Sequence, residues 1–251
     1  MATHYIIDNN EGILTGQTIN SGLTINGTLS EGLNTIASGN YSHSEGSNTT
    51  ASGLYSHAEG NYTTASGFYS HAEGSVTMAS GEASHAEGLS TTASGYYSHS
   101  EGFITIASGQ NSHAEGQETS ATTYNTHAEG IGTLASGTGS HAEGYGTKAT
   151  GINSHSQNLY TTASGFYSHA GGSGSTATGV SSFIHSSNST VSGDRSAVIG
   201  GQNIVGSTAD TVYMPKVELD EVAASIIMKS PDGTRYKLTI ANGGTISISL
   251  A

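Results

Sequence analysis

Residues 63–74 read Thr-Thr-Ala-Ser-Gly-Phe-Tyr-Ser-His-Ala-Glu-Gly, and close variants of this phrase return every fourteen residues along most of the chain. The histidine of the phrase recurs ten times without a slip, from His43 to His169. The phase continues beyond the histidines, because Leu29 lies fourteen residues before the first, and Phe183 and Ala197 lie fourteen and twenty-eight residues after the last. Thirteen coils in one register therefore extend from about residue 25 to 200, and such a short fixed period is typical of a solenoid.

Each fourteen-residue unit divides into two near-sevens, and each seven ends in glycine, as at Gly67 and Gly74. In the first near-seven this glycine is replaced only at Thr123. The period is too short for a pair of helices, whereas glycine tolerates the tight corner between two short strands. The pattern predicts two strands per coil in a flattened parallel roll. At about 4.8 Å per stacked strand, thirteen coils would span roughly 60 Å.

The side chains of a strand alternate between its two faces. In Tyr-Ser-His-Ala-Glu, the Ser and Ala are small enough to face the inside of a thin roll, while Tyr, His and Glu face the other way. The Thr and Ala of Thr-x-Ala-Ser-Gly fill the rest of the interior. Such a core buries little apolar area against the conformational entropy lost on folding. We therefore expect the chain to need partner copies, with the His/Glu face as a candidate interface.

The charge distribution excludes one class of partner. The net charge is −13, and Lys148 is the only basic residue before Asp194, against thirteen acidic residues. A chain with so few cations there cannot neutralise phosphates, so we expect no nucleic-acid partner. No apolar run is long enough to span a bilayer, and no secretory leader follows Met1, so we also expect no membrane insertion.

No catalytic centre is expected. A hydrolase would need a nucleophile, a base and an orienting group in one cleft. The Ser that precedes most of the His residues here belongs to an unbroken repeat, so it does not indicate a catalytic group. We accordingly predict neither an enzyme nor a cofactor.

The phrases Thr-Ala-Ser-Gly and Ser-His-Ala-Glu-Gly resemble the head repeats of trimeric autotransporter adhesins, whose coils read roughly Thr-Ala-x-Gly-x-x-Ser-Val-Ala-Ile-Gly. Residues 196–201, Ser-Ala-Val-Ile-Gly-Gly, are closer still to that form, and the resemblance covers about 170 of 251 residues. It implies an all-β fold, a left-handed parallel β-roll solenoid of fourteen-residue coils in a homotrimer. Here His and Glu replace the Val and Ile that the family turns toward the trimer centre.

This match implies a trimer-interface ladder, with each glutamate accepting a hydrogen bond from a histidine of the same or a neighbouring chain, because buried polar groups persist only when paired. There are two alternatives: the His and Glu side chains could bind a metal ion on the three-fold axis, or they could face solvent. We expect hydrogen bonds between them and no metal. The predicted ladder positions are His43, Glu45, His57, Glu59, His71, Glu73, His85, Glu87, His99, Glu101, His113, Glu115, His127, Glu129, His141, Glu143, His155, His169 and Phe183.

The C-terminal segment leaves the repeat. Strand-like runs at 225–230, 234–240 and 245–250 are separated by Pro-Asp-Gly and Asn-Gly-Gly, which are strong hairpin signals. They predict a small β-meander. Residues 229–236, Lys-Ser-Pro-Asp-Gly-Thr-Arg-Tyr, resemble the end module of bacteriophage fibre proteins. The expected organisation is an N-terminal docking or capping segment at 1–24, the β-roll at 25–206 and a tip or cap at 207–251.

Together these features predict a structural and attachment protein: a homotrimeric fibre or spike segment of a phage virion, in a tail or head fibre, that projects and binds a host surface. The alternatives are the head of a bacterial surface adhesin, and a self-processing or glycan-cleaving fibre. We expect other virion proteins to contact the N-terminal segment, and a host-surface receptor or glycan to contact the tip. The tip candidates are Arg195, Tyr213, Lys216, Lys229, Arg235, Tyr236 and Lys237.

Overall fold

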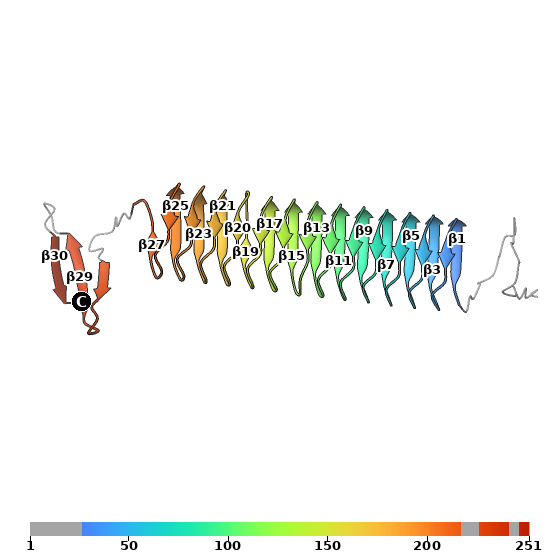
Figure 1. Ribbon diagram of the computed structural model, residues 1–251, viewed down its shortest axis with the longest axis horizontal. Coiled ribbons are helices and arrows are strands. Elements are labelled where there is room, and N and C mark those ends of the chain that lie inside the picture. Colours follow the sequence, from blue (N-terminus) through green and yellow to red (C-terminus); the bar gives the residue numbers. More distant parts are fainter. Residues whose placement is uncertain (1–26, 217–225, 241–245, 251) are drawn as a thin grey trace, which may run out of the picture. The chain divides into compact units, whose positions relative to one another are not determined.

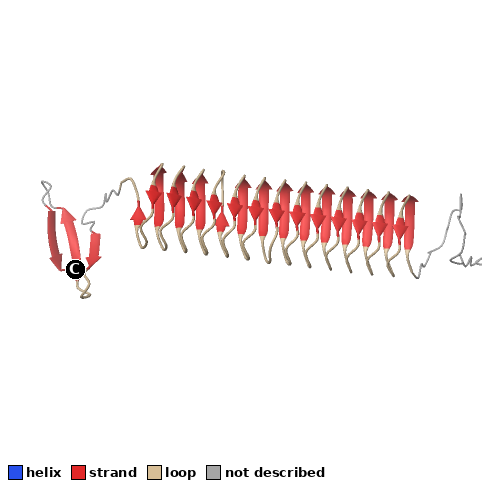
Figure 2. Ribbon diagram, in the orientation of Figure 1, coloured by secondary structure: helices blue, strands red, loops and turns tan. Residues whose placement is uncertain are grey.

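The structure is a computed structural model that describes residues 27–216, 226–240 and 246–250. The chain divides into two compact units, residues 1–144 and 145–251, and each is considered by itself. The described residues form strands, turns and bends without a helix (Figure 2). Accordingly, this part of the chain has no helix with the length and apolarity needed to cross a bilayer.

In the first unit, strands of five residues alternate with strands of two residues. The five-residue strands are β1 (Leu29–Leu33), β3 (His43–Ser47), β5 (His57–Asn61), β7 (His71–Ser75), β9 (His85–Leu89), β11 (His99–Phe103), β13 (His113–Gln117), β15 (His127–Ile131) and β17 (His141–Tyr145), the last ending one residue beyond the unit. The two-residue strands are β2 (Ile36–Ala37), β4 (Thr50–Ala51), β6 (Thr64–Ala65), β8 (Met78–Ala79), β10 (Thr92–Ala93), β12 (Ile106–Ala107), β14 (Ser120–Ala121) and β16 (Leu134–Ala135).

Each strand pairs in parallel with the strand one coil away, at an offset of fourteen residues. Leu29 lies opposite His43, and His99 opposite both His85 and His113. The two-residue strands keep the same offset, as where Thr92 lies opposite Ile106. Figure 1 shows these coils stacked one behind another. The predicted parallel roll with two strands per coil is confirmed.

The second unit continues the pattern with β18 (Lys148–Ala149), β19 (His155–Ser156), β20 (Thr162–Ala163), β21 (His169–Ser173), β22 (Thr176–Ala177), β23 (Phe183–Ser187), β24 (Thr190–Val191), β25 (Ala197–Gln202), β26 (Val205–Gly206) and β27 (Val212–Tyr213). His169, Phe183 and Ala197 stay in register although the residue type changes. Between β23 and β25 the register shifts by one residue. From there the offset is fifteen, and β27 still pairs with β25.

The C-terminal strands form the predicted meander. The strands β28 (Ile226–Lys229), β29 (Arg235–Ile240) and β30 (Ile246–Leu250) make an antiparallel sheet in the order β28-β29-β30. At the first turn, Ser230 donates its backbone N–H to the Thr234 carbonyl at 2.9 Å. Asp232 accepts the Thr234 N–H at 2.9 Å. The expected turn at 242–244 and the N-terminal segment 1–24 lie outside the described residues.

The interior of the roll consists of small side chains, as the alternation predicts. In the coil around His57, the side chains of Ser56, Ala58, Thr63 and Ala65 are all buried. Among the described residues, larger aliphatic side chains are fully buried only in the second unit, at Ile184, Val191 and Val198. Most coils are therefore held by backbone hydrogen bonds and close packing of small groups rather than by a large apolar core.

The corners differ from the expectation in one respect. Every seventh residue adopts the left-handed conformation, and most of these residues are not glycine; Tyr55 and Tyr62, for example, have φ of 55° and 54°. The tyrosine of Tyr-Ser-His-Ala-Glu is thus a corner residue, whereas the alternation predicted a strand residue. The reason is that each corner reverses the chain within very few residues, which positive φ allows.

Candidate functional site: the histidine–glutamate ladder

The first unit carries a column of paired side chains, called here the ladder: the histidines and glutamates at the first and third positions of β3, β5, β7, β9, β11, β13, β15 and β17. Within each of these strands the intervening Ala or Ser points into the core, so the His and Glu both emerge on the opposite face. Their side chains are about a third exposed, for example 35% for His57 and 33% for Glu59. The repeat thus builds a continuous His/Glu surface.

The imidazole rings of the ladder stack in register. From His43 to His141, successive ring centroids lie 4.7–4.9 Å apart, with planes within 7° of parallel. This separation equals the spacing of neighbouring strands. Successive rings of the ladder therefore share one orientation.

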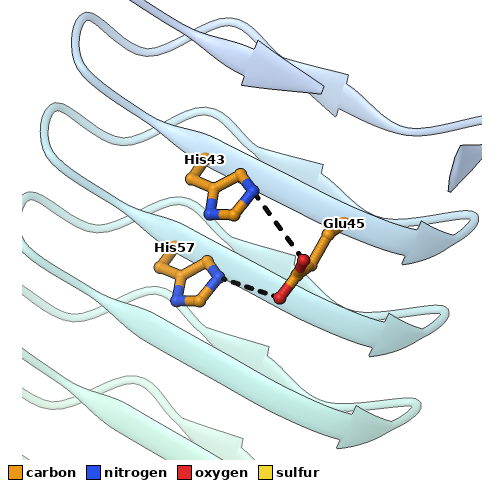
Figure 3. A group of neighbouring side chains, drawn as sticks. All are labelled: His43, Glu45 and His57. Carbon is orange, nitrogen blue, oxygen red and sulfur yellow. Dashed lines mark ion pairs between the residues drawn. The ribbon is translucent and has the colours of Figure 1, made fainter. Parts of the chain in front are cut away.

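The carboxylates lie beside the rings and mostly face the histidine of the next coil. From His43 to His141, each Nε2 lies 3.0–3.9 Å from a carboxylate oxygen of the preceding coil. Glu45 approaches both His43, at 3.9 Å, and His57, at 3.8 Å (Figure 3). The partner in the structure is thus a residue of the same chain, twelve positions earlier.

Few of these approaches are hydrogen bonds. His99 reaches Glu87 at 3.0 Å and His127 reaches Glu115 at 3.3 Å, whereas separations of 3.7–3.9 Å are too long for one. Accordingly, several Nε2 atoms are buried with no hydrogen-bond partner. Among the described residues these include His43, His57, His71, His85 and His113.

Burial and crowding alter the proton affinity of the ladder. The pKa values of His57 and His113 fall below the usual value, first because burial desolvates the imidazolium and then because each ring lies between two others, whose charge would repel it. The adjacent carboxylates oppose this effect without reversing it. The pKa of Glu115 is raised by burial and by its hydrogen bonds with Glu101 and Glu129. The neutral form is therefore favoured at His57 and His113.

In the second unit the ladder loses its carboxylates. The residues at the glutamate position are Gln157, Gly171 and His185. The rings of His155 and His169 meet edge to face at 85°. Phe183 then stacks on His169, with centroids 4.9 Å apart. The predicted positions His155, His169 and Phe183 share one sheet, but the residue two positions after each of them is not a glutamate.

The predicted tip residues lie in two parts of the chain, the end of the roll and the C-terminal sheet. Arg195 binds both carboxylate oxygens of Asp210, at 2.6 and 2.9 Å, at a corner of the roll. Tyr213 packs on the core below the last coils, and its hydroxyl accepts the Thr208 N–H at 2.9 Å. Lys216 follows β27, while the other four candidates, Lys229, Arg235, Tyr236 and Lys237, lie on β28 and β29. As a binding site they remain a prediction.

Two features escaped the sequence reasoning. Glu31 belongs beside the ladder, because its carboxylate lies 3.9 Å from His43; its position fourteen residues before Glu45 was the signal that could have found it. The corner tyrosines Tyr41, Tyr55 and Tyr69 stack at 5.0 and 5.3 Å. Only the left-handed corner conformation brings these rings into line.

The comparison with protein families agrees with this geometry. The model of the YadA head domain repeat matches residues 30–56 and 44–70, as two copies of the repeat. No curated protein sequence matches the chain. Both matched stretches lie in the first unit, and each spans one coil and most of the next. Residues 30–70 therefore match YadA head domain repeats, and the later coils resemble them in their fourteen-residue register.

Proposed function

We propose that this chain is a segment of a homotrimeric fibre or spike on a phage virion, which projects from the particle and attaches to a host surface. The observation that carries the proposal is the thin, regular solenoid with YadA-type head repeats. Such repeats point to an adhesin-like trimeric fibre. The head-repeat solenoid is a structural adhesin fold, and the proposal includes no catalytic activity.

The composition of the core supports trimer formation. Apart from Ile184, Val191 and Val198, the largest fully buried side chains are threonines. Alanine, serine and threonine supply little apolar burial to offset the entropy of ordering fourteen residues per coil. Burial against two further copies would supply the missing area. We place the ladder on the three-fold axis, since its positions correspond to the apolar positions of related heads.

The assignment to a phage rests on the C-terminal sheet. Its first hairpin carries the sequence Lys-Ser-Pro-Asp-Gly-Thr-Arg-Tyr at residues 229–236, which resembles the end module of phage fibres. In this proposal residues 1–24 contact other virion proteins and the C-terminal region meets the receptor or glycan. The head of a bacterial surface adhesin is the second candidate, favoured by the family match itself.

Oligomeric state is the first test. Mass photometry and sedimentation equilibrium at micromolar concentration, in chelator, are expected to give three times the chain mass of 25.3 kDa. A folded monomer under these conditions would contradict the proposal. A fluorescent trimer should then label host cells, and a variant lacking residues 226–250 should remain a trimer of the shortened chain but no longer label the cells. Labelling that survives this deletion would exclude the C-terminal sheet as the attachment site.

A further inference from the structure

We propose, against the expectation from the sequence, that the ladder of the first unit binds divalent transition-metal ions of the zinc class, at sites that each combine histidine and glutamate side chains of the ladder. Five groups of three ladder residues have one ligand atom each within 4.8 Å of the others. They are His43–Glu45–His57, His71–Glu73–His85, His85–Glu87–His99, His113–Glu115–His127 and Glu129–His141–Glu143.

The separations suit metal ligands better than hydrogen bonds. Zinc bonds of about 2.0–2.2 Å in tetrahedral geometry hold two ligand atoms about 3.3–3.6 Å apart. The Nε2–carboxylate separations of the ladder, 3.0–3.9 Å, bracket that value. Successive histidine rings lie 4.7–4.9 Å apart, wider than one ion spans. In the four groups with two histidines, the second histidine would reach the ion by rotation of its partly exposed ring.

The state of the nitrogens points the same way. The Nε2 atoms of His43, His57, His71, His85 and His113 are buried and lack a hydrogen-bond donor or acceptor, yet each faces a carboxylate. A buried polar atom without a partner costs free energy. A cation between nitrogen and carboxylate removes that cost at both ends. Imidazole together with carboxylate favours zinc, nickel, copper or cobalt over magnesium and calcium, which prefer oxygen ligands alone.

The repeat also limits how many ions can bind. Each carboxylate lies between two coils, so ions in successive coils would compete for it, and two divalent ions one strand spacing apart would repel each other strongly. Two of the five groups share His85. Removing one of them leaves four groups without a common residue, so we expect about four ions per ladder.

Every ligand in these groups belongs to one chain, so the proposal does not depend on trimer formation. If three ladders face one axis, the three equivalent groups at one height share a single ion. The expected count is then about four ions per trimer. Oligomeric state measured in chelator tests the trimer separately, and metal uptake tests the ladder.

The experiment titrates chelator-treated, full-length protein with Zn²⁺ by calorimetry, and with Cu²⁺ by electron paramagnetic resonance. We expect saturable Zn²⁺ uptake, nitrogen hyperfine splitting from imidazole in the Cu²⁺ spectrum, and no comparable uptake of Mg²⁺. Glu115→Gln should remove about a quarter of the Zn²⁺ sites. Glu118→Gln is the matched control, because Glu118 lies in the same coil, is exposed at a corner and belongs to none of the groups. Glu118→Gln removes the same charge as Glu115→Gln but should keep every Zn²⁺ site.

A second ladder variant, Glu45→Gln, should also lose about a quarter of the sites, which guards against a folding defect at one position. Circular dichroism in chelator should be unchanged for all three variants. The proposal is overturned by an absence of saturable uptake, by equal losses in Glu115→Gln and Glu118→Gln, or by a Cu²⁺ spectrum without nitrogen coupling.

Discussion

Single residues inside the roll follow a rule that links two positions five residues apart. Where a coil has serine in place of the core alanine, its hydroxyl contacts the threonine hydroxyl five residues later at 2.7–2.8 Å; these pairs are Ser44–Thr49, Ser100–Thr105 and Ser156–Thr161. Where a coil has alanine, the corresponding threonine hydroxyl is often buried without a partner, as at Thr63, Thr77, Thr91, Thr119 and Thr133. Serine at this position therefore satisfies a hydroxyl that alanine leaves unpaired.

This rule predicts opposite effects for two substitutions. Ser100→Ala leaves the Thr105 hydroxyl unpaired and should lower the free energy of unfolding by about 1–2 kcal/mol. Ala86→Ser gives Thr91 a partner and should raise it by about 0.5–1 kcal/mol. Denaturant unfolding measures both. Ala86→Ser combined with Thr91→Val is the control, since the new hydroxyl then has no partner; a gain that persists there would refute the pairing.

Backbone strain at a corner gives a second prediction. Val76 has φ of 58°, which is costly for a β-branched residue, and its side chain is 53% exposed, so it recovers little by burial. Asparagine occupies the same kind of corner at Asn34 and Asn48, where the two side chains hydrogen-bond at 3.1 Å. Val76→Asn should therefore stabilise the protein by about 1 kcal/mol. Val76→Thr keeps the branch and should give no gain in the same thermal-unfolding assay; an equal gain would exclude strain as the cause.

The structure of a single coil could be predicted from the sequence because one phrase repeats along the chain. Period, strand number and the small-residue core follow from glycine spacing and from alternation. The reason for the glycines is less visible. Gly67 does not adopt positive φ; instead its position one coil above Gly81 leaves no room, because a Cβ would lie 1.9 Å from the Gly81 carbonyl oxygen. Stacking of backbone on backbone, rather than corner flexibility, favours glycine at this position, where Thr123 is the one exception among the coils.

Two glycine substitutions separate these roles. Gly67→Ala forces adjacent coils apart and should destabilise the protein severely, by more than about 3 kcal/mol, since the obstacle is backbone and cannot rotate away. At Gly132, φ is 64° and a Cβ would have no atom within 4 Å. Gly132→Ala should therefore cost only about 1 kcal/mol of conformational strain. Soluble yield and melting temperature measure both, and similar losses at the two sites would contradict the stacking argument.

Replacing one layer of the ladder tests which way that face points. His99→Val together with Glu101→Ile gives one coil the apolar pair of related heads and removes the contacts of His99 with Glu87 and of Glu101 with His113. If the ladder is axial, the melting temperature should rise, because polar burial is costly compared with apolar packing. Lower solubility with no rise in melting temperature would place the face in solvent and remove the axial arrangement. Thr92→Val, on the neighbouring short strand, is the control for a general effect of added apolar area.

At the scale of the whole chain, predictability ends where the repeat ends. The register from His169 through Phe183 to Ala197 was predictable from spacing alone, because strand pairing depends on the phase rather than on the residue type. The contact of each histidine with the glutamate twelve residues earlier was not, since it depends on side-chain rotamers across two coils. The predicted tip residues were chosen from a local excess of positive charge, which does not predict which residues they contact. Arg195 illustrates the limit: its partner is Asp210, reached only after the offset changes to fifteen.

The stacked histidines predict how the stability of the whole molecule depends on pH. The pKa values of His57 and His113 are lowered in the folded protein. His57 lies among His43, His71, Glu45 and Glu59, and the desolvation and ring repulsion outweigh the carboxylates. The unfolded chain, with histidine pKa values near about 6.5, therefore binds more protons in this range than the folded chain. The stabilising contribution is present above that pH and is lost as the pH falls below it.

We accordingly expect the melting temperature, measured in chelator, to be constant above about pH 7.5 and to fall between about pH 7 and 5.5. The raised pKa of Glu115 acts in the opposite direction, because a carboxyl that binds its proton more tightly when folded stabilises the protein on acidification. The lowered pKa values of Glu101 and Glu129 act in the same direction as the histidines. All three contributions fall at lower pH, near the usual pKa range of carboxyl groups. His57→Gln with His113→Gln should flatten the decline, since glutamine does not titrate. A melting temperature that rises on acidification through this range would show that the carboxylates dominate, and would reverse the sign assigned to the ladder.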